Sequence, residues 1–408
     1  MKLLKLTTAI LLSVLFVQQA FPRQDTPLPK IFLANPKIVA EMRSKAHAES
    51  ESLSGVLDRL KKDARKALDF EPVSVTTKTK LAPSDDKHDY MSLAPYWWPD
   101  PSKPDGKPYI RRDGEVNPER SEVADRDNYR ALQQHIWTLA CAYYFLGDEK
   151  YAEHAALLLR TWYLNPDTKM NPNMNFAQAI IGRNEGRGAG LIEAANLSRI
   201  VDALGFLDDS KSWTAEDKKG MEEWMKEYYR WLRESPVGMD ESDAPNNHGS
   251  WYAQQAASMA LFLGKREEAR AIIEAVKSKR IAAQIEPDGR QPKELVRTRS
   301  LHYSMFNIEA LFRIALIGDR LNVNLWDYTT ADGRSLRKAL DLLVPAATGK
   351  AKWAFQEIGT VEDEEVYTLL HIAAWRYRDS DYATKAQAVS KNFKRERAHL
   401  FYPLMSIE

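Results

Sequence analysis

The protein has 408 residues, 58 of them basic and 57 acidic, so its formal net charge is +1, and its hydrophobic fraction of 44% is that of an ordinary globular protein. This near-neutral charge argues against a nucleic-acid partner bound over the whole surface, because neutralising phosphates requires an excess of Lys and Arg. A local basic cleft is still compatible with the net charge. Trp and Tyr are abundant, at 11 and 17, whereas the single Cys141 excludes an intramolecular disulfide and a cysteine-based zinc site.

The N-terminal residues predict export. Lys2 and Lys5 precede an apolar run over residues 6–17, which is shorter than a bilayer span and fits a secretory signal peptide over residues 1–22. The alternative, a buried N-terminal helix, is disfavoured by the two lysines. No lipobox cysteine follows, and no later segment is apolar enough to span a bilayer. We therefore expect a periplasmic or secreted protein in which residues 23–408 form a single domain.

The rest of the chain reads as helical, with one long interruption. A helical stretch is predicted over residues 38–68, and from residue 70 to about 126 the chain is rich in Pro, Asp, Lys and Gly. Such a long ordered connection in a compact domain tends to be functional. Beyond residue 128, apolar residues recur at three- and four-residue spacing, as in amphipathic helices.

Four segments in this helical part share one pattern, an amphipathic helix, a small or polar turn, and a second helix rich in Ala. They begin near Cys141, Met259, Arg313 and Ile372. Gly147, Gly264 and Gly318 are predicted to be left-handed caps that end the first helix of three of them. Repeated helical hairpins bury their apolar faces against one another, which leaves an α-solenoid or an α/α toroid. The irregular spacing of the units favours the toroid, so we predict an all-α fold, an incomplete or closed toroid with long functional loops.

The first polar motif, APNNHGSWY, lies at the predicted start of an Ala-rich helix and contains Asn246, Asn247 and His248. Either asparagine can cap that helix, because its side-chain oxygen accepts from free N–H groups. Two amides and an imidazole at a helix N-terminus also form a site for a carboxylate.

The second motif, KELVRTRSLHYSMF, contains Arg297, Arg299, His302 and Tyr303. Arg299 and Tyr303 share a helical face, and Arg297 reaches the same centre if the chain near it is extended. A guanidinium beside a tyrosine lowers its pKa, which would let Tyr303 act as a base and then as an acid. The alternative is an interior tyrosine with structural arginines on an exposed face.

The third motif, IGRNEGRGAG, has the glycines of a nucleotide-binding loop, but we expect no strand before it and reject that function. Asn184, Glu185 and Arg187 are instead predicted at a helix terminus, either facing a cleft or forming a buried ion pair.

The fourth motif is Tyr96-Trp97-Trp98 in a proline-bounded loop. Flat aromatic rings stack on sugars, so the loop is predicted to place them at the mouth of a cleft. The alternative is that the loop anchors itself by packing its tryptophans into the helical body.

Other catalytic signatures are missing from the sequence. The eight His residues form no HxH or HExxH motif, and there is no GxSxG motif, so no metal and no cofactor are predicted, and Cys141 is expected to be buried and inert.

Together these residues resemble alginate lyase-type polysaccharide lyases. NNHGSWY and RTRSLHY resemble polysaccharide lyase family 5, whereas YWWPDP and NEGRGAG are more similar to family 38. The resemblance covers the chain from about residue 83 to the last helices. It implies an α/α toroid that cleaves a 1,4-linked uronate polymer by metal-independent β-elimination, so that residues 23–408 would be one catalytic domain with an anionic polysaccharide as its partner.

Residue by residue, the resemblance implies that Asn247 and His248 are the family's Asn-His pair and that Tyr303 is its catalytic tyrosine. Arg297 is our choice for its arginine, with Arg299 as the competitor. The remaining candidates are assigned to substrate binding: Arg299, Asn246, Trp97, Trp98, Tyr96, Asn184, Glu185, Arg187 and His302.

Chemistry supports this assignment. Removing the C5 proton of a uronate requires its carboxylate to be neutralised by preorganised donors, a role for Asn247, His248 and an arginine. In mannuronate and glucuronate the C5 proton and O4 lie on one side of the ring, so Tyr303 can serve as base and acid, whereas in guluronate His248 would be the base.

Two alternative functions remain at this stage. A glycoside hydrolase needs two acids across the bond, for which Glu185, Asp243 and Glu294 are the candidates. A non-catalytic glycan-binding solenoid would use the aromatic loop alone.

Overall fold

The computed structural model describes residues 27–404, so the predicted signal peptide lies outside the described residues. The α-helices are α1 (Pro36–His47), α2 (Ser54–Leu68), α3 (Asp125–Leu146), α4 (Glu149–Leu159), α5 (Leu197–Leu207), α6 (Ala215–Glu234), α7 (Pro236–Asp243), α8 (Asn247–Phe262), α9 (Arg266–Val276), α10 (Ala282–Gln284), α11 (Pro292–Leu295), α12 (Ser300–Asp319), α13 (Leu336–Ala347), α14 (Asp363–Tyr377), α15 (Ser380–Val389) and α16 (Ala398–Phe401). The strands are β1 (Met91–Leu93), β2 (Trp97–Trp98), β3 (Ile110–Arg111) and β4 (Phe176–Ala179).

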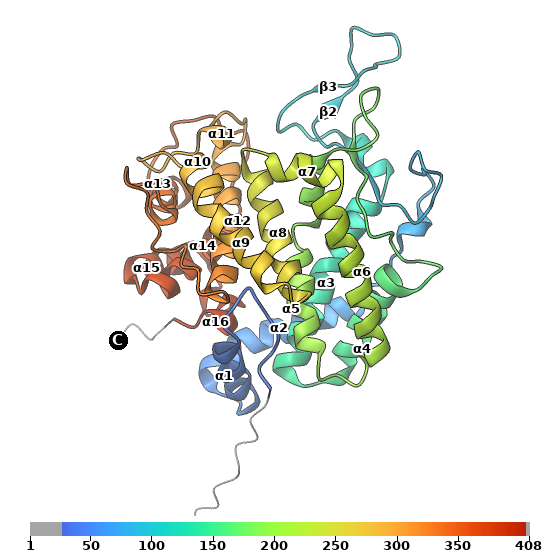
Figure 1. Ribbon diagram of the computed structural model, residues 1–408. Coiled ribbons are helices and arrows are strands. Elements are labelled where there is room, and N and C mark those ends of the chain that lie inside the picture. Colours follow the sequence, from blue (N-terminus) through green and yellow to red (C-terminus); the bar gives the residue numbers. More distant parts are fainter. Residues whose placement is uncertain (1–26, 405–408) are drawn as a thin grey trace, which may run out of the picture.

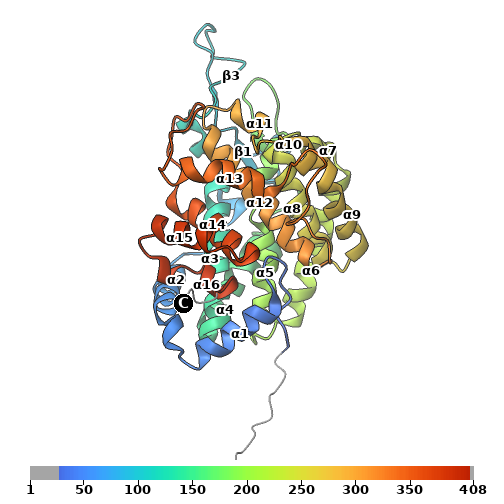
Figure 2. The same cartoon turned by 90° about the vertical axis from the view of Figure 1, so that its left-hand side faces the viewer.

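The helices form an α/α toroid, which confirms the predicted all-α fold (Figure 1). Helices α3, α5, α8, α12 and α14 contact one another in that order and make the inner layer. Helices α4, α9, α13 and α15 each pack outside an inner helix as the second member of a hairpin. Between α14 and α3 the link is made by α16 and α1, as the turned view also indicates (Figure 2).

Local signals explain most helix ends. Gly147 and Gly264 adopt positive φ angles of 75° and 71° after α3 and α8, as predicted for left-handed caps. Gly318 was wrongly predicted to be such a cap, because α12 continues through it and ends at Asp319. Its role is close packing, since a Cβ there would lie 2.6 Å from the Val323 carbonyl oxygen. The predicted helix over residues 38–68 is two helices, because Glu49 between them is left-handed, with φ 52°.

Helix α8 is buried on almost every side. From Asn247 to Leu261 every residue except His248 is buried. His248 lies in the first turn, so the N-terminal turn is the part of this stretch that is open to a ligand.

The long segment between α2 and α3 lies across one end of the toroid. Its strand β1 pairs in parallel with β4. Strands β2 and β3 form an antiparallel hairpin that stands out from the body (Figure 1), and within it Trp97 pairs with Arg111. We call residues 96–114 the hairpin. One prediction is wrong here. No strand was expected before the glycine-rich motif IGRNEGRGAG, but β4 ends just before it.

Two further expectations concern single features. Cys141 is buried in α3, as predicted, and burial raises the pKa of its thiol to about 12, which keeps it protonated. Among the helices of residues 27–404, none has the length and apolar character needed to cross a membrane.

Candidate active site

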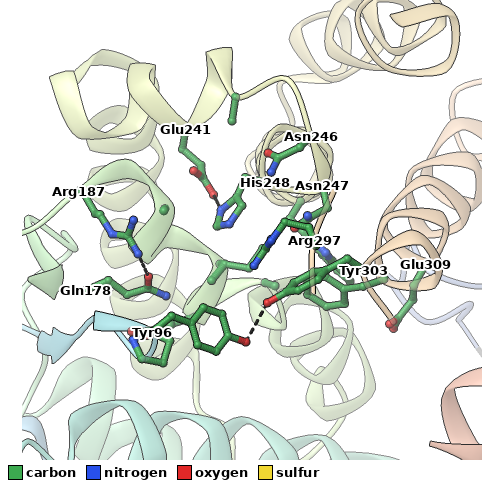
Figure 3. A pocket seen from close by; sticks show the side chains of 18 of the residues that line it. Tyr96, Gln178, Arg187, Glu241, Asn246, Asn247, His248, Arg297, Tyr303 and Glu309 are labelled. Atoms are coloured by element: carbon green, nitrogen blue, oxygen red, sulfur yellow. Dashed lines mark hydrogen bonds and ion pairs between the residues drawn. The ribbon is translucent and has the colours of Figure 1, made fainter. Parts of the chain in front are cut away.

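A cavity of about 950 Å³ opens at the end of the toroid beneath the hairpin (Figure 3). Its walls come from the hairpin, the segment after β4, α7, the first turn of α8, α11 and the start of α12. Eight Lys or Arg side chains and six Asp or Glu side chains line it. The basic side chains outnumber the acidic ones, so a nearly neutral protein encloses a cavity with a local positive balance.

Asn247 is the first residue of α8 and is held by a buried carboxylate. Its backbone N–H and its Nδ2 donate to the two carboxylate oxygens of Glu294, at 2.6 and 2.7 Å. Burial raises the pKa of Glu294, and the two hydrogen bonds from Asn247 oppose that rise. The amide oxygen of Asn247 has no partner among the described residues. Neither predicted asparagine cap forms, since Asn246 occupies the N-cap position without a side-chain hydrogen bond.

His248 follows in the same turn and is oriented by Glu241. Its Nδ1 lies 2.7 Å from Oε1 of Glu241, a side chain of which only 3% is exposed (Figure 3). With the proton on Nδ1, Nε2 of the neutral ring is left as a hydrogen-bond acceptor. The ring itself is half-buried and lines the cavity. His248 can therefore accept a proton from a molecule bound there.

The loop before α8 is fixed from behind by α10 and the turn preceding it. Arg280 donates to the carbonyl oxygens of Ser242 and Ala244, and Gln284 donates to that of Asn246. Gly249 makes this possible, because a Cβ there would lie 2.1 Å from the Ala244 carbonyl oxygen and 2.4 Å from the Arg280 guanidinium. The Asn-His pair is thus placed by backbone contacts as well as by its two carboxylates.

Tyr303 lies in the first turn of α12 and points into the cavity. Its hydroxyl donates to the hydroxyl of Tyr96 at 2.8 Å, and the Arg297 guanidinium lies 3.7 Å from the centre of its ring. Burial raises the pKa of Tyr303 well above its usual value, and Arg297 only partly opposes this. The expected lowering by neighbouring guanidinium groups is therefore wrong in its net direction, because desolvation outweighs the charge of Arg297.

Arg297, and not Arg299, lies at this centre. Arg297 is held by the hairpin, with Nε and Nη2 both donating to the carboxylate of Asp113. Its Nη1 has no partner among residues 27–404 and stays available to a ligand. Arg299 instead faces the loop at residues 357–360, where Nη2 donates to the Thr360 carbonyl oxygen, and it does not line the cavity.

Asp113 connects the hairpin to this arginine. Burial alone would raise the pKa of Asp113, but hydrogen bonds from Arg297 and Thr298 hold it well below its usual range. Gly114 beside it has φ 78°, and a Cβ there would lie 2.4 Å from Oγ1 of Thr298. The close approach of hairpin and Arg297 therefore depends on a glycine at that position.

Removing the Asp113 carboxylate is expected to destabilise the protein. Asp113→Asn should lower the free energy of unfolding by about 1.5–3 kcal/mol, because hydrogen bonds to a charged group inside the protein are lost. Urea denaturation followed by circular dichroism measures it. Asp332→Asn is the matched control, since Asp332 also pairs with an arginine, Arg334 at 2.9 Å, but with a half-exposed side chain. Equal effects of the two substitutions would contradict the prediction.

The aromatic residues of the hairpin divide between two roles. Tyr96 and Trp97 line the cavity, and the Arg183 guanidinium lies 5.0 Å from the centre of the Trp97 ring. Trp98 does not line it; its Nε1 donates to the Glu115 carbonyl oxygen within the same segment. Trp98 thus anchors the hairpin to the residue that follows it, while its two neighbours face the cavity.

The glycine-rich motif also contributes only in part. Arg187 lines the cavity and donates to Oε1 of Gln178 at 2.6 Å (Figure 3). Gln178 has a φ of 51°, an uncommon conformation for a residue other than glycine. Asn184 and Glu185 are exposed in the turn after β4, where Oδ1 of Asn184 accepts from the Ile180 N–H, so they lie outside the cavity rather than at a helix terminus.

The remaining candidates are placed as follows. His302 lines the cavity, with its ring stacked on Phe306 and its Nδ1 3.3 Å from Glu365. Of the three acids considered for a hydrolase, only Asp243 lines the cavity. In the part of the chain that the structure describes, no three His, Cys, Asp or Glu side chains are grouped closely enough to hold a metal ion.

Sequence reasoning missed three residues that hold the predicted ones, namely Glu241, Asp113 and Gln178. Glu241 lies on α7 and His248 on α8, so their contact depends on the non-helical break between the two helices and no helical spacing signals it. Asp113 and Arg297 are separated by 184 residues, and nothing in their local sequences links them.

Comparisons with known proteins place the chain among polysaccharide lyases. A crystal structure of an alginate lyase from Bacteroides ovatus is 39% identical, with a TM-score of 0.88 over 93% of this chain and 100% of that one. Alginate lyase A1-III from Sphingomonas species A1 has the same fold, with a TM-score of 0.60 at 19% identity over 92% of this chain and 97% of that one. No curated protein matches the chain.

The family follows directly. The alginate lyase family model matches residues 74–353, and the chain belongs to the alginate lyase family. It is an enzyme, a polysaccharide lyase.

Proposed function

We propose that this lyase cleaves 1,4-linked uronate polymers, alginate rich in mannuronate or a glucuronan, by β-elimination without a metal ion. The observation that carries the proposal is the convergence of Asn247, His248, Arg297 and Tyr303 on one cavity. The relatives named above are described as alginate lyases, and two structures of A1-III variants are complexes with a tetrasaccharide.

The first requirement is to neutralise the substrate carboxylate, whose negative charge opposes loss of the adjacent C5 proton. The free Nη1 of Arg297 supplies a charged donor, and the helix N-terminus at Asn247 adds its dipole. Asn247 contributes through its amide. Its Nδ2 is already shared with Glu294, so we expect Asn247 to turn or to share that proton when the substrate binds.

In a mannuronate or glucuronate chain, Tyr303 would perform both proton transfers. As the phenolate it takes the C5 proton, the electron pair forms the C4=C5 double bond, and O4 leaves with the proton that Tyr303 returns. Arg297 over its ring favours the phenolate and opposes the burial that disfavours it. The Tyr96 hydroxyl acts in the other direction in this structure, because it accepts a hydrogen bond from the protonated Tyr303 at 2.8 Å.

In a guluronate chain the C5 proton and O4 lie on opposite faces of the sugar. His248 would then be the base, with Nε2 accepting the C5 proton while Glu241 stabilises the resulting imidazolium. Tyr303 in its protonated form would protonate O4. Burial favours the protonated form of Tyr303, and this guluronate reaction requires that form.

The raised pKa of Tyr303 gives the first reaction a definite pH dependence. Because the phenolate is the minor form below that pKa, kcat/KM on polymannuronate should increase by up to about tenfold per pH unit between neutral and mildly alkaline pH. Initial rates in buffers of constant ionic strength measure it, with Tyr303→Phe as the control for uncatalysed elimination. A rate that is constant or falls over this range would rule out Tyr303 as the base.

The substrate is tested by following the ultraviolet absorbance of the unsaturated product. Polymannuronate, polyguluronate, glucuronan and a neutral glucan are compared at equal chain length. We expect turnover of mannuronate or glucuronate polymers and none of the neutral glucan. New reducing ends without absorbance would instead indicate a hydrolase, and binding without turnover a glycan-binding protein.

We also propose that the enzyme acts in the periplasm or outside the cell. The support is the pair of lysines followed by an apolar run within residues 1–22. Mass spectrometry of the protein recovered from periplasmic and culture fractions tests this, since export predicts a chain shortened by the signal peptide.

A further inference from the structure

A second cavity of about 370 Å³ adjoins the active-site cavity inside the toroid. The two are lined in common by six residues, which we call the junction: Arg130, Gln133, Asn196, Arg199, Glu309 and Arg313. They come from three inner helices, α3, α12 and the start of α5. The second cavity continues from the junction toward α2 and α16, away from the hairpin.

One face of α12 runs along both cavities. Tyr303 and Phe306 line the first, Glu309 and Arg313 belong to the junction, and Leu316 lines the second. At a rise of about 1.5 Å per residue this face is roughly 20 Å long. The path is therefore long enough for sugar units beyond the one that is cleaved at Tyr303.

Two of the four charged side chains at the junction pair with each other, and a third, Arg130, is exposed to solvent. Arg313 donates to Glu309 at 2.6 Å and to Oδ1 of Asn196 at 3.1 Å, and its guanidinium lies 5.0 Å from the centre of the Trp251 ring. Arg313 and Glu309 thus neutralise each other. Among residues 27–404, no carboxylate lies within ion-pair distance of Arg199.

Arg199 is a partly buried cation without a counter-ion. No ion pair or hydrogen bond of its side chain is found among the described residues, although burial and the neighbouring Arg313 lower its pKa to about 10 and leave it charged at neutral pH. Gln133 nearby is 2% exposed, and its Nε2 has no partner either. Proteins rarely keep buried donors and cations unpaired, because both lose their hydration without compensation.

The nearest acid on the same helix does not fill this role. Asp202, one turn further along α5, accepts hydrogen bonds from the backbone N–H groups of Phe32 and Leu33, at 2.7 and 3.0 Å. Burial raises its pKa to about 7, so the protonated form is well populated at neutral pH. Asp202 therefore does not supply a counter-charge for Arg199.

We propose that the junction is a subsite for the carboxylate of a uronate unit other than the one that is cleaved. Arg199 is its ion-pair partner, and Gln133 donates a hydrogen bond to the same sugar. The proposal rests on the function proposed above, because it takes the substrate to carry one carboxylate per sugar. It makes Arg199 a determinant of the length of chain that the enzyme prefers.

The test compares Arg199→Gln with the unaltered enzyme on mannuronate oligomers from the trimer to the hexamer. Only complexes with a bond at Tyr303 are cleaved, so kcat/KM reports productive binding. We expect a loss of about tenfold for oligomers long enough to reach the junction and no loss for shorter ones, since one charge-assisted contact is removed. Arg199→Lys should recover part of it. The same loss at every length, or no loss at any, would overturn the proposal.

Two further measurements distinguish a subsite arginine from a structural one. Arg320→Gln is the matched control, because Arg320 is also partly buried but lines neither cavity. Arg199→Gln should leave the melting temperature unchanged or raise it, since an unpaired buried charge is removed, whereas a structural arginine would lower it. If no uronate oligomer is cleaved at all, calorimetry with hexamannuronate decides: tenfold weaker binding by Arg199→Gln supports the subsite, and equal or absent binding by both proteins refutes it.

Discussion

Tyr303→Phe is expected to lower kcat on polymannuronate by about 10²–10⁴-fold, with a much smaller change in KM. The substitution removes one oxygen and keeps the ring on which Arg297 packs, at 3.7 Å from its centre. Substrate binding should therefore persist while both proton transfers are lost. Steady-state kinetics measured by product absorbance give the two parameters separately.

Tyr96→Phe is the control for this substitution. It removes the hydroxyl that accepts from Tyr303 at 2.8 Å, and it leaves the Tyr303 hydroxyl in place. We expect a loss smaller than that of Tyr303→Phe, because only the hydrogen bond to the base is affected. If Tyr96→Phe is the more damaging change, the proton-transfer roles belong to Tyr96.

The fold was largely predictable because its signals are local. Apolar residues at helical spacing and glycine caps such as Gly147 lie within a few residues of the helices that they define. The prediction that Gly318 is a helix cap was wrong for a physical reason. A glycine can end a helix or allow close packing, and the sequence does not distinguish the two until Val323 is seen to approach it.

The candidate site was predictable only in its central residues. Asn247, His248, Arg297 and Tyr303 lie in two short motifs, and the structure brings these motifs to one cavity. The pKa of Tyr303 was not predictable, since burial, which the sequence does not give, outweighs the effect of Arg297. The choice between Arg297 and Arg299 also depended on a distant residue, Asp113, which holds only the first.

Asn247→Asp is expected to reduce kcat/KM by about 10²–10³-fold, the effect of losing one preorganised donor to the developing negative charge. The side chain keeps its size, but an amide that donates to Glu294 is replaced by a second carboxylate against it. Two adjacent buried carboxylates cannot both ionise easily, so we also expect a lower melting temperature at neutral pH than at pH values near 5. Kinetics and calorimetry on one sample measure both effects.

The sign of the pH effect follows from the raised pKa of the pair. The folded protein holds a proton that the unfolded chain releases near the usual carboxyl pKa, so the variant is stabilised in acid and loses stability as pH rises through the folded pKa. Asn246→Asp is the matched control. Asn246 is the N-cap of α8, where a carboxylate interacts favourably with the helix dipole. Equal losses of activity in the two variants would mean that a general repulsion, and not the position of Asn247, is responsible.

The most direct test of the account is the mass of the products from a purified mannuronate tetrasaccharide. β-Elimination adds no water, so the masses of the two fragments should sum to that of the substrate, and one fragment should absorb in the ultraviolet through its C4=C5 bond. The same assay with Tyr303→Phe should give neither fragment. Fragments whose summed mass exceeds that of the substrate by one water molecule, without absorbance, would establish hydrolysis and contradict the proposed reaction.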